Sequence, residues 1–281
     1  MNKTYHFLGG LPRSGNTLLA ALLNQHPSVY ASPLSPLGGY LQYLDQQVSF
    51  NENCLRNQEN GDRTHTLTKS LFDVFYQGVE KPVVIDRDKF WGNKNGVQLL
   101  NLYVTDSPKI IFTVRDILEI IASFVSLNRE YYKNTVMSSG MPVTTYLGLT
   151  DAAADHLMAP GNSIDLALMA LASSFDPDFA GMFHIVEYND LVTNTQETMD
   201  KIYTFLNLPA FTNDLSNIQK REIDREELAG HIKGLHDVHA TIKHSSTNPE
   251  FVLSEYVRNK YSKLEFWRAG NPMQIKGRDF S

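Results

Sequence analysis

The sequence predicts a three-layer α/β fold in which a mostly parallel sheet lies between two layers of helices. Two observations lead to this prediction. Four short apolar runs rich in β-branched residues, typical of strands buried on both faces of a sheet, alternate with segments of helical periodicity. The first run leads into a glycine-containing turn and then a helix, which is the strand–turn–helix of a P-loop-like phosphate site. Repeated strand–helix alternation favours one parallel sheet covered on both sides.

The apolar runs and the periodic segments locate the elements along the chain. Strands are expected at residues 5–8, 82–86, 109–114 and 183–188. Helices are expected directly after strands at residues 16–24, 117–127 and 195–206, and elsewhere at residues 35–47, 66–78, 94–103 and 162–174. No linker-like stretch interrupts this alternation, so it predicts one sheet.

Length and segment composition favour a single domain over residues 1–281. A chain of this size can bury enough surface for a sheet with two covered faces. Residues 128–161 contain a run rich in Gly, Pro, Ser and Thr, which predicts a substrate loop more than another core element. The polar tail, residues 210–281, is expected to form a C-terminal cap over one edge of the sheet, with a helix around residues 219–228.

Composition narrows the classes of function. The 25 Lys+Arg against 31 Asp+Glu give a formal net charge of -6, whereas nucleic-acid binders usually carry a basic surplus. Cys54 is the single cysteine, which excludes an internal disulfide framework and a multi-cysteine metal site. No segment resembles a signal peptide or approaches the roughly 20 apolar residues that span a bilayer. A cytoplasmic protein without nucleic-acid or membrane partners is expected.

The segment between the first strand and the first helix has the chemistry of a phosphate cradle. Glycines, including Gly15, let the backbone approach an anion, and the first amides of a helix direct free N–H groups at it. Arg13 adds a bidentate cation, and Ser14 and Thr17 add hydroxyl donors. These residues, together with Asn16, are therefore expected to bind a phosphate group.

Asn16 stands where the loops of nucleoside-triphosphate enzymes have lysine. Since that lysine reaches the outer phosphates, its absence beside Arg13 favours a different phosphate ester over ATP or GTP. A P-loop kinase or nucleotide hydrolase remains an alternative, with Asp86 as the end of its magnesium-binding strand. A non-catalytic nucleotide-binding protein is the other alternative.

A second anion site is expected at the strand 109–114. Arg115 falls at the carboxyl end of this strand, where α/β sheets bind ligands, and Ser123 follows eight residues later on the next helix. An arginine fork and a hydroxyl can share one phosphate. Alternatively, Arg115 pairs with Asp116 or Glu119, and Ser123 is a small residue in a helix contact.

These two motifs resemble those of the sulfotransferases, in particular the branch of tyrosylprotein sulfotransferases and their bacterial and phage relatives. Residues 12–19 resemble the 5′-phosphosulfate loop of that family, although Asn16 replaces a residue that is often threonine. Residues 109–116 with Ser123 resemble its 3′-phosphate site. The resemblance implies a sulfotransferase fold and transfer of a sulfuryl group from 3′-phosphoadenosine 5′-phosphosulfate (PAPS) to a hydroxyl or amine. PAP is then the product, and no metal is needed.

The resemblance also implies further contacts to the donor. Residues 186–192 resemble the late strand of the family, whose tyrosine lies near the nucleotide, so Tyr188 is expected there. Lys243 is the candidate for a basic C-terminal loop that closes over the donor. A cation near the bridging oxygen is usual in the family, and Arg87 and Lys89 are the candidates for it.

The general base departs from the family pattern. The acidic pair of tyrosylprotein sulfotransferases has no counterpart in residues 30–37, and the histidine of the small-molecule enzymes is absent too. Asp86 and Asp88 are the nearest carboxylates, and either can act as base if burial raises its pKa. A salt bridge to Arg87 or Lys89 is the alternative for both. His236 and His239 are the further candidates for the base. Because the acidic pair is absent, a small-molecule or glycan acceptor is expected in place of a protein tyrosine.

Overall fold

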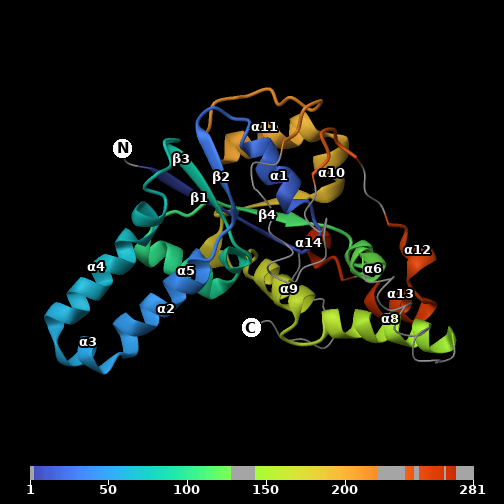
Figure 1. Ribbon diagram of the computed structural model, residues 1–281, viewed down its shortest axis with the longest axis horizontal. Helices are drawn as coiled ribbons and strands as arrows, with labels where there is room; N and C mark the ends of the chain where they lie inside the picture. The colour runs from blue at the N-terminus through green and yellow to red at the C-terminus, as the bar shows by residue number, and fades with distance from the viewer. Residues whose placement is uncertain (1–2, 128–142, 220–237, 244–246, 263, 270–281) are drawn as a thin grey trace.

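The computed structural model describes residues 3–127, 143–219, 238–243, 247–262 and 264–269. Its centre is a five-stranded sheet of order β2-β3-β1-β4-β5, in which every pairing of neighbours is parallel (Figure 1). The strands are β1 (Thr4–Gly10), β2 (Val29–Leu34), β3 (Val83–Arg87), β4 (Ile110–Val114) and β5 (Phe183–Glu187). The predicted α/β fold with a parallel sheet is confirmed.

Strand β2 was not predicted from the sequence, whereas the other strands match their predictions to within a few residues. Its sequence, Val-Tyr-Ala-Ser-Pro-Leu, includes Pro33, which lacks an N–H for a sheet. As an edge strand, β2 tolerates this residue, and its register against β3 shifts between Ala31 and Leu34. Tertiary pairing therefore overrides a weak local strand signal.

One face of the sheet is covered by α1 (Asn16–Leu23), α10 (Tyr188–Thr193) and α11 (Thr195–Phe205). Since side chains alternate along a strand, Leu8, Ile85 and Ile111 all point to this face and pack against these helices. The apolar helix α1 has buried residues at nearly every position of its second half. This layer holds the helix that follows the first strand firmly against the sheet.

The opposite face packs against α2 (Leu37–Phe50), α4 (Gln58–Phe75), the short η1 (Lys89–Gly92) and α5 (Lys94–Tyr103). Phe7, Val84 and Trp91 form the centre of this second cluster. Beyond it, α2 and α4 extend as a pair away from the sheet and are joined through α3 (Glu52–Arg56), as Figure 1 shows at lower left. The predicted helices 94–103 and 35–47 correspond to α5 and α2.

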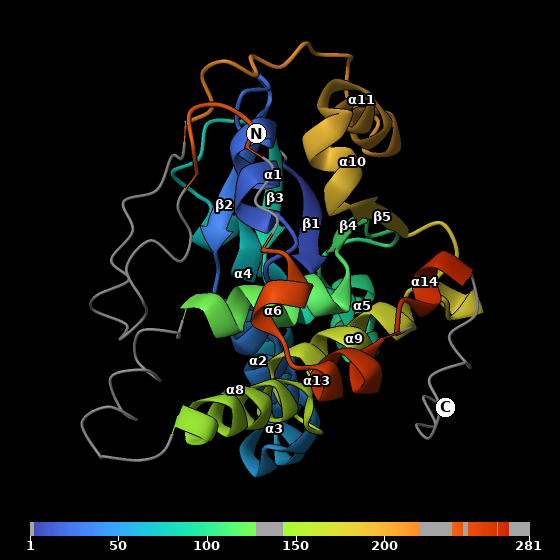
Figure 2. The same cartoon turned by 90° about the vertical axis from the view of Figure 1, so that its right-hand side faces the viewer.

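A third cluster lies beyond the carboxyl end of β4. It contains α6 (Ile117–Leu127), α8 (Val143–Met158), α9 (Ser163–Ser173), α12 (Pro249–Val252), α13 (Glu255–Tyr261) and α14 (Phe266–Ala269), while η2 (Pro177–Phe179) precedes β5. Helices α6, α8 and α13 pack against one another (Figure 2). Because this cluster lies at the edge where strands end, it forms one wall next to the expected ligand site.

The prediction of a loop over residues 128–161 is wrong for residues 143–158, which form α8. Ala154 and Met158 of this helix are buried in the third cluster. Threonines and a glycine weaken the helical signal of the segment, and packing against α6 and α9 compensates for it. Residues 128–142 lie outside the described part of the chain.

The tail beyond residue 210 contributes to two clusters. Its first part packs against the α11 layer through Phe211, Leu215 and Ile218, and α12 to α14 pack with α6 and α8. Almost all of the helix predicted at residues 219–228 lies outside the described residues. Among the helices that the structure does describe, none is both long enough and apolar enough to cross a membrane.

Candidate functional site

The phosphate loop (residues 11–15) connects β1 to α1, and only glycine fits at its last residue, Gly15, and at Gly10, the residue directly before the loop. At Gly10, a Cβ atom would collide with the side chain and carbonyl oxygen of Thr113 on the neighbouring strand. Gly15 has a φ of 89°, in the left-handed region, and a Cβ there would lie 3.0 Å from the Tyr188 ring. Gly15 is also the N-cap of α1 and offers no side-chain cap, and the first N–H groups of a helix have no partner within the helix itself. This arrangement creates an anion site.

Two polar side chains of this segment turn inward, away from the expected phosphate. Ser14 is fully buried, and its hydroxyl donates to the carbonyl oxygen of Leu11 beside the Thr113 hydroxyl. Asn16 donates from Nδ2 to the same Leu11 carbonyl at 3.2 Å. The sequence suggested that the Ser14 hydroxyl binds the phosphate, whereas the structure assigns it to the interior of the loop, which leaves only its backbone N–H for a ligand. Thr17, in the first turn of α1, is half-buried.

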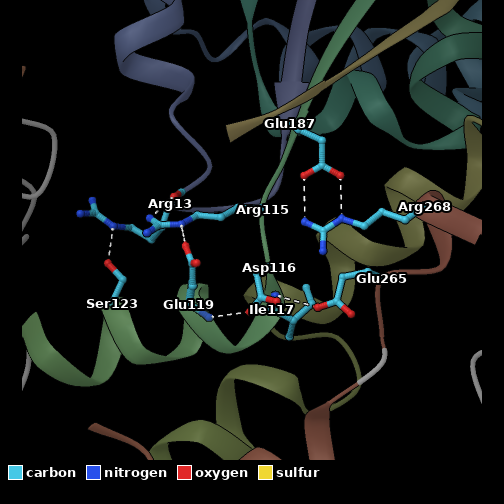
Figure 3. Close-up of polar contacts among 9 residues, drawn as sticks. All are labelled: Arg13, Arg115, Asp116, Ile117, Glu119, Ser123, Glu187, Glu265 and Arg268. Carbon is cyan, nitrogen blue, oxygen red and sulfur yellow. Dashed lines mark hydrogen bonds and ion pairs between the residues drawn. The ribbon is translucent and has the colours of Figure 1, made fainter. Parts of the chain in front are cut away.

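Arg13 lies at the outer side of the phosphate loop and connects it to α6. Its φ of 61° places a non-glycine residue in the left-handed region, which is uncommon and typical of functional sites. Its Nε donates to the hydroxyl oxygen of Ser123 at 3.1 Å (Figure 3). The two residues that the sequence assigned to different phosphates therefore touch each other.

Arg115, the first residue after β4, is 5% exposed and is held from three directions. Its Nε donates to the Glu119 carboxylate at 2.8 Å, and its Nη1 donates to the backbone carbonyl oxygen of Arg13 at 3.0 Å (Figure 3). The Tyr188 ring lies 4.2 Å from the guanidinium carbon, a cation–π contact. The pairing with Glu119 that the sequence left open is present, and Arg115 also adjoins the phosphate loop, as a donor site requires.

Tyr188 begins α10 directly after β5 and is nearly buried. Its ring packs along Gly15 on one side and stacks on Arg115 with its face. The sequence predicts this tyrosine near the donor nucleotide, and in the structure its ring lies next to Gly15 of the phosphate loop and to Arg115. Arg13, Gly15, Arg115, Ser123 and Tyr188 thus form one contact network.

Arg87 and Lys89 occupy the end of the neighbouring strand β3. Since Val83 and Ile85 face the α1 layer, alternation directs Arg87 to the same side. Arg87 is paired with Leu8, two residues before β1 ends, and it is 7% exposed. Lys89, in η1, is exposed. Of the two predicted cations, Arg87 is the one directed toward the layer of the phosphate loop.

Asp86 points to the opposite face and is completely buried. Its carboxylate accepts hydrogen bonds from Ser35 Oγ at 2.8 Å, from Trp91 Nε1 at 2.5 Å and from the Tyr76 hydroxyl. Burial raises its pKa to about 6, and the three donors oppose that rise. Because protein groups surround both carboxylate oxygens, this geometry gives Asp86 a structural role and disfavours it as the base that meets an acceptor.

Asp88 is 8% exposed and accepts hydrogen bonds from two backbone N–H groups. Its Oδ1 accepts from the N–H of Phe90 at 3.0 Å and its Oδ2 from the N–H of Gly38 at 3.1 Å. Burial raises the pKa of Asp88, and the two N–H groups and the charge of Lys89 oppose this rise. A salt bridge to Arg87 or Lys89 was the alternative for both aspartates, but hydrogen bonds from other groups hold them instead.

The predicted C-terminal residues are only partly described. Lys243 and His239 are exposed and lie on either side of Ala240, whose carbonyl oxygen accepts a hydrogen bond from Ile218 N–H at 2.8 Å. His236 lies outside the described residues. The contacts of Lys243 with a donor thus stay a prediction.

Sequence reasoning missed a polar cluster where the C-terminal segment meets the sheet. Glu187, the last residue of β5, accepts hydrogen bonds from Arg268 Nε at 2.9 Å and Nη2 at 3.0 Å (Figure 3). It also accepts one from Trp267 Nε1 at 2.9 Å. Next to it, Glu265 accepts from the N–H of Ile117 at the start of α6 at 3.3 Å. The partners Trp267 and Arg268 follow Glu187 by 80 and 81 residues, so the sequence around Glu187 does not indicate this contact.

The arrangement has relatives among known proteins. The profile of the Sulfotransferase family matches residues 6–213. The protein-tyrosine sulfotransferase of Drosophila melanogaster is 25% identical over 209 residues, a match that covers 72% of this chain and only 38% of that protein. The structure of mouse sulfotransferase SULT7A1 complexed with PAP is similar with a TM-score of 0.53 and 11% identity, covering 95% of this chain and 87% of the mouse chain. At this identity the structural likeness concerns the fold.

The family profile extends over most of the chain, from β1 through the phosphate loop, Arg115 and Tyr188 to the segment after α11. The glycine-bearing turn and the arginine at the next strand end are thus part of one matched region. The chain belongs to the sulfotransferase family.

Proposed function

We propose that this chain transfers the sulfuryl group of PAPS to a hydroxyl or amine of a small-molecule or glycan acceptor. The observation that supports this most is the contact between two anion-binding elements on neighbouring strands. The N–H groups at the start of α1 belong to one, and Arg115 with Ser123 to the other. A donor nucleotide with separate 3′- and 5′-phosphates requires two such sites in one pocket.

Each element has a defined role in donor binding. The N–H groups at the start of α1 and the Arg13 guanidinium would hold the 5′-phosphate, and Arg115 and Ser123 the 3′-phosphate. Tyr188 would lie beside the nucleotide and Lys243 would cover it. The PAP in the mouse relative supports a bisphosphate nucleotide as the ligand of this fold.

Charge stabilisation during transfer falls to cations around the phosphate loop. Negative charge grows on the departing 5′-phosphate, and preorganised donors that face it lower the barrier. Arg13 and the α1 amides supply this stabilisation, and Arg87 is the candidate for the oxygen between phosphate and sulfur, with Lys89 as the second choice. Fixed elements of the sheet hold Arg87 in place, so little reorganisation accompanies its role.

Asp88 is the stronger candidate of the two aspartates for the general base. Burial raises its pKa toward the working range of a base, and each of its oxygens receives one backbone N–H, which leaves capacity to accept a further proton. Asp86, in contrast, is enclosed by Ser35, Tyr76 and Trp91. Asp88→Asn is therefore the variant that tests the base.

Thermal unfolding with nucleotides tests the donor. PAP without metal is expected to raise the melting temperature more than 5′-AMP or ATP with Mg²⁺, and to lose its advantage in Arg115→Ala. Transfer of labelled sulfate from PAPS to a panel of hydroxyl and amine acceptors then tests the reaction. Equal stabilisation by ATP with Mg²⁺ would contradict the proposal and favour a kinase or nucleotide hydrolase. PAP binding without transfer to any acceptor would favour a non-catalytic nucleotide-binding protein.

Arg13→Ala is expected to fold normally and to slow transfer by roughly 100-fold, the usual effect of losing one preorganised donor. Arg13 is half-buried at the loop surface, so its truncation opens no cavity in a core. Steady-state kinetics with PAPS and circular dichroism measure the two effects. Lys94→Ala is the control, because it removes an exposed cation that pairs with Asp176 outside the network. An unfolded Arg13→Ala variant would show that Arg13 is structural.

A further inference from the structure

We propose that Arg115 is a positioning residue for the 5′-phosphate as well as a ligand of the 3′-phosphate. It would hold the phosphate loop in its binding conformation through the Arg13 carbonyl, so that both halves of the site act as one unit. This inference rests on the proposed function. The inference goes beyond the proposed function because it gives Arg115 an effect on the 5′-phosphate, to which Arg115 does not bind.

The phosphate loop needs an external support. Arg13 and Gly15 both have positive φ values, 61° and 89°. A non-glycine residue such as Arg13 adopts this conformation rarely, and it persists where the surroundings fix it. Successive turns of this kind direct neighbouring N–H groups to one side, which makes an anion-binding concavity. The orientation of the loop amides therefore depends on what holds the peptide of Arg13.

Arg115 supplies that support. Its Nη1 donates to the carbonyl oxygen of Arg13 at 3.0 Å, which fixes the peptide plane directly before Ser14. This is a charge-assisted hydrogen bond in a buried setting, stronger than a bond between neutral groups. The contact joins residues 102 positions apart, so no local feature of the loop sequence can replace it.

Arg115 can hold the loop because it is itself fixed. Glu119, one turn along α6, accepts from its Nε at 2.8 Å, and the side chains of this pair are only 6% and 20% exposed. The Tyr188 ring covers the guanidinium face at 4.2 Å. Residues of α6 and α10 thus orient the Arg115 guanidinium, and its third contact is the bond to the Arg13 carbonyl oxygen in the phosphate loop. Figure 3 shows the contacts with Glu119 and Arg13.

Two further contacts connect the same groups. Tyr188 also packs on Gly15, where an added Cβ would lie 3.0 Å from its ring. In the other direction, Arg13 donates from Nε to Ser123 at 3.1 Å. A shift of Arg115 would therefore disturb both ends of the loop turn, and this predicts coupling between the two phosphate sites.

The test uses 5′-AMP, which has no 3′-phosphate, and the variant Arg115→Lys, which keeps the charge and loses the fork. The full-length variant is expected to bind 5′-AMP about tenfold more weakly than the wild type, the scale of one lost charge-assisted hydrogen bond. PAP affinity falls by at least as much. Arg268→Lys is the matched control, because it makes the same change in a fork that pairs with Glu187, and its 5′-AMP affinity should stay within twofold.

Unchanged 5′-AMP affinity in Arg115→Lys, with PAP affinity reduced, would overturn the inference and leave Arg115 as a ligand of the 3′-phosphate alone. Hydrogen exchange in the free protein provides a second readout that needs no ligand. Peptides covering residues 9–19 are expected to exchange faster in Arg115→Lys than in the wild type, with peptides remote from Arg115, Glu119 and Tyr188 unchanged. If the wild type bound no nucleotide, the proposed function would fail, and unchanged exchange in this segment would then overturn the inference separately.

Discussion

Single backbone positions decide whether the phosphate loop can form. Gly15→Ala is expected to destabilise the fold by about 1 to 3 kcal/mol, because alanine is strained at a φ of 89° and its Cβ would crowd Tyr188 and Leu191. The same change tilts the first amides of α1, so PAP affinity should fall as well. Urea unfolding and isothermal titration calorimetry measure the two effects.

Gly39→Ala is the matched control for this prediction. Gly39 lies in α2, where an added Cβ meets nothing within 4 Å and the backbone is helical. The substitution is expected to stabilise the protein by roughly 0.4 to 1 kcal/mol through the unfolded chain. If both glycines behaved alike, the special geometry of Gly15 would not be the cause.

His6 makes the free energy of unfolding depend on pH in the acidic range. It is a buried residue of β1, and burial, aided by the nearby charge of Lys109, lowers its pKa to about 4. Its unfolded pKa is about 6.5, so its contribution to the free energy of unfolding is complete above that pH and is lost as the pH falls toward 4. The loss amounts to about 3 kcal/mol at most. His6→Leu should flatten this part of the pH profile of urea unfolding; an unchanged slope would contradict the assignment.

For single residues, the sequence predicted which side chains lie near the phosphate loop, but it did not predict the direction in which some of them point. The positions of Arg13, Arg115 and Tyr188 follow from strand ends that meet at one edge of a parallel sheet. The inward turn of Ser14 depends on the Leu11 carbonyl and on Thr113 of the next strand. Such contacts across the sheet leave no trace in the loop sequence.

Among the elements, β3 and α4 are joined through a buried carboxylate. The Tyr76 hydroxyl, just after α4, donates to Asp86, and this bond keeps the pKa of Asp86 from rising above about 6. Tyr76→Phe should cost about 1 to 3 kcal/mol at pH 8. The pKa of Asp86 is 3.8 in the unfolded chain and about 6 in the folded protein. Asp86 therefore contributes to stability below pH 3.8, and this contribution is lost as the pH rises through about 6. The variant's penalty should therefore be smaller at pH 5, which urea unfolding at both pH values measures.

Tyr5→Phe is the control for this prediction. Tyr5 donates to Asp73 on α4 at 2.6 Å, but this pair is exposed, so water can replace the lost partner. A cost below about 0.5 kcal/mol, with no difference between pH 5 and pH 8, is expected. Equal penalties for the two tyrosines would mean that burial of Asp86 does not matter.

The predicted elements differ in accuracy for a physical reason. The predicted ranges 94–103 and 117–127 coincide with α5 and α6, whose periodic apolar residues face a core. The expected helix 66–78 covers only the second half of α4, because residues 58–66 are polar and pack on α2 and α3. β2 and α8 were missed since Pro33 and the threonine-rich start of α8 oppose their local conformations. Strong amphipathic patterns are readable, whereas elements that depend on a neighbour are not.

Across the whole molecule, the C-terminal segment is fastened to the sheet at Glu187. Burial tends to raise the pKa of this carboxyl, but hydrogen bonds from Arg268 and Trp267 outweigh burial and lower it. Arg268→Ala should lower the free energy of unfolding by roughly 1 kcal/mol. This value is modest because the Arg268–Glu187 pair is partly exposed and screened by solvent. The expected local effect is faster hydrogen exchange in α14 and at the start of α6, measured by mass spectrometry.

An exposed pair on the projecting helices is the control. Arg56 and Glu52 form an i,i+4 ion pair on α3, with side chains 78% and 68% exposed, so Arg56→Ala should change stability very little. Faster exchange at α14 in this variant as well would mean that the response is not specific to the Glu187 contact. Unchanged exchange in Arg268→Ala would show that apolar packing of Trp267 alone holds the segment.

The order of the strands separates the main donor elements from the edge strand β2. The central strand β1 and its hydrogen-bonded neighbour β4 carry the elements proposed for the donor, whereas β2, with its proline and its shifted register, forms the far edge and leads into α2. An edge strand has one neighbour, so its replacement breaks one ladder, and here also the bond from the Arg87 N–H to Ser32 Oγ that joins β3 to β2. Exchange of residues between Val29 and Phe50 would therefore change the surroundings of Arg87, Asp86 and Asp88, while it leaves the contact of Arg115 with the phosphate loop in place.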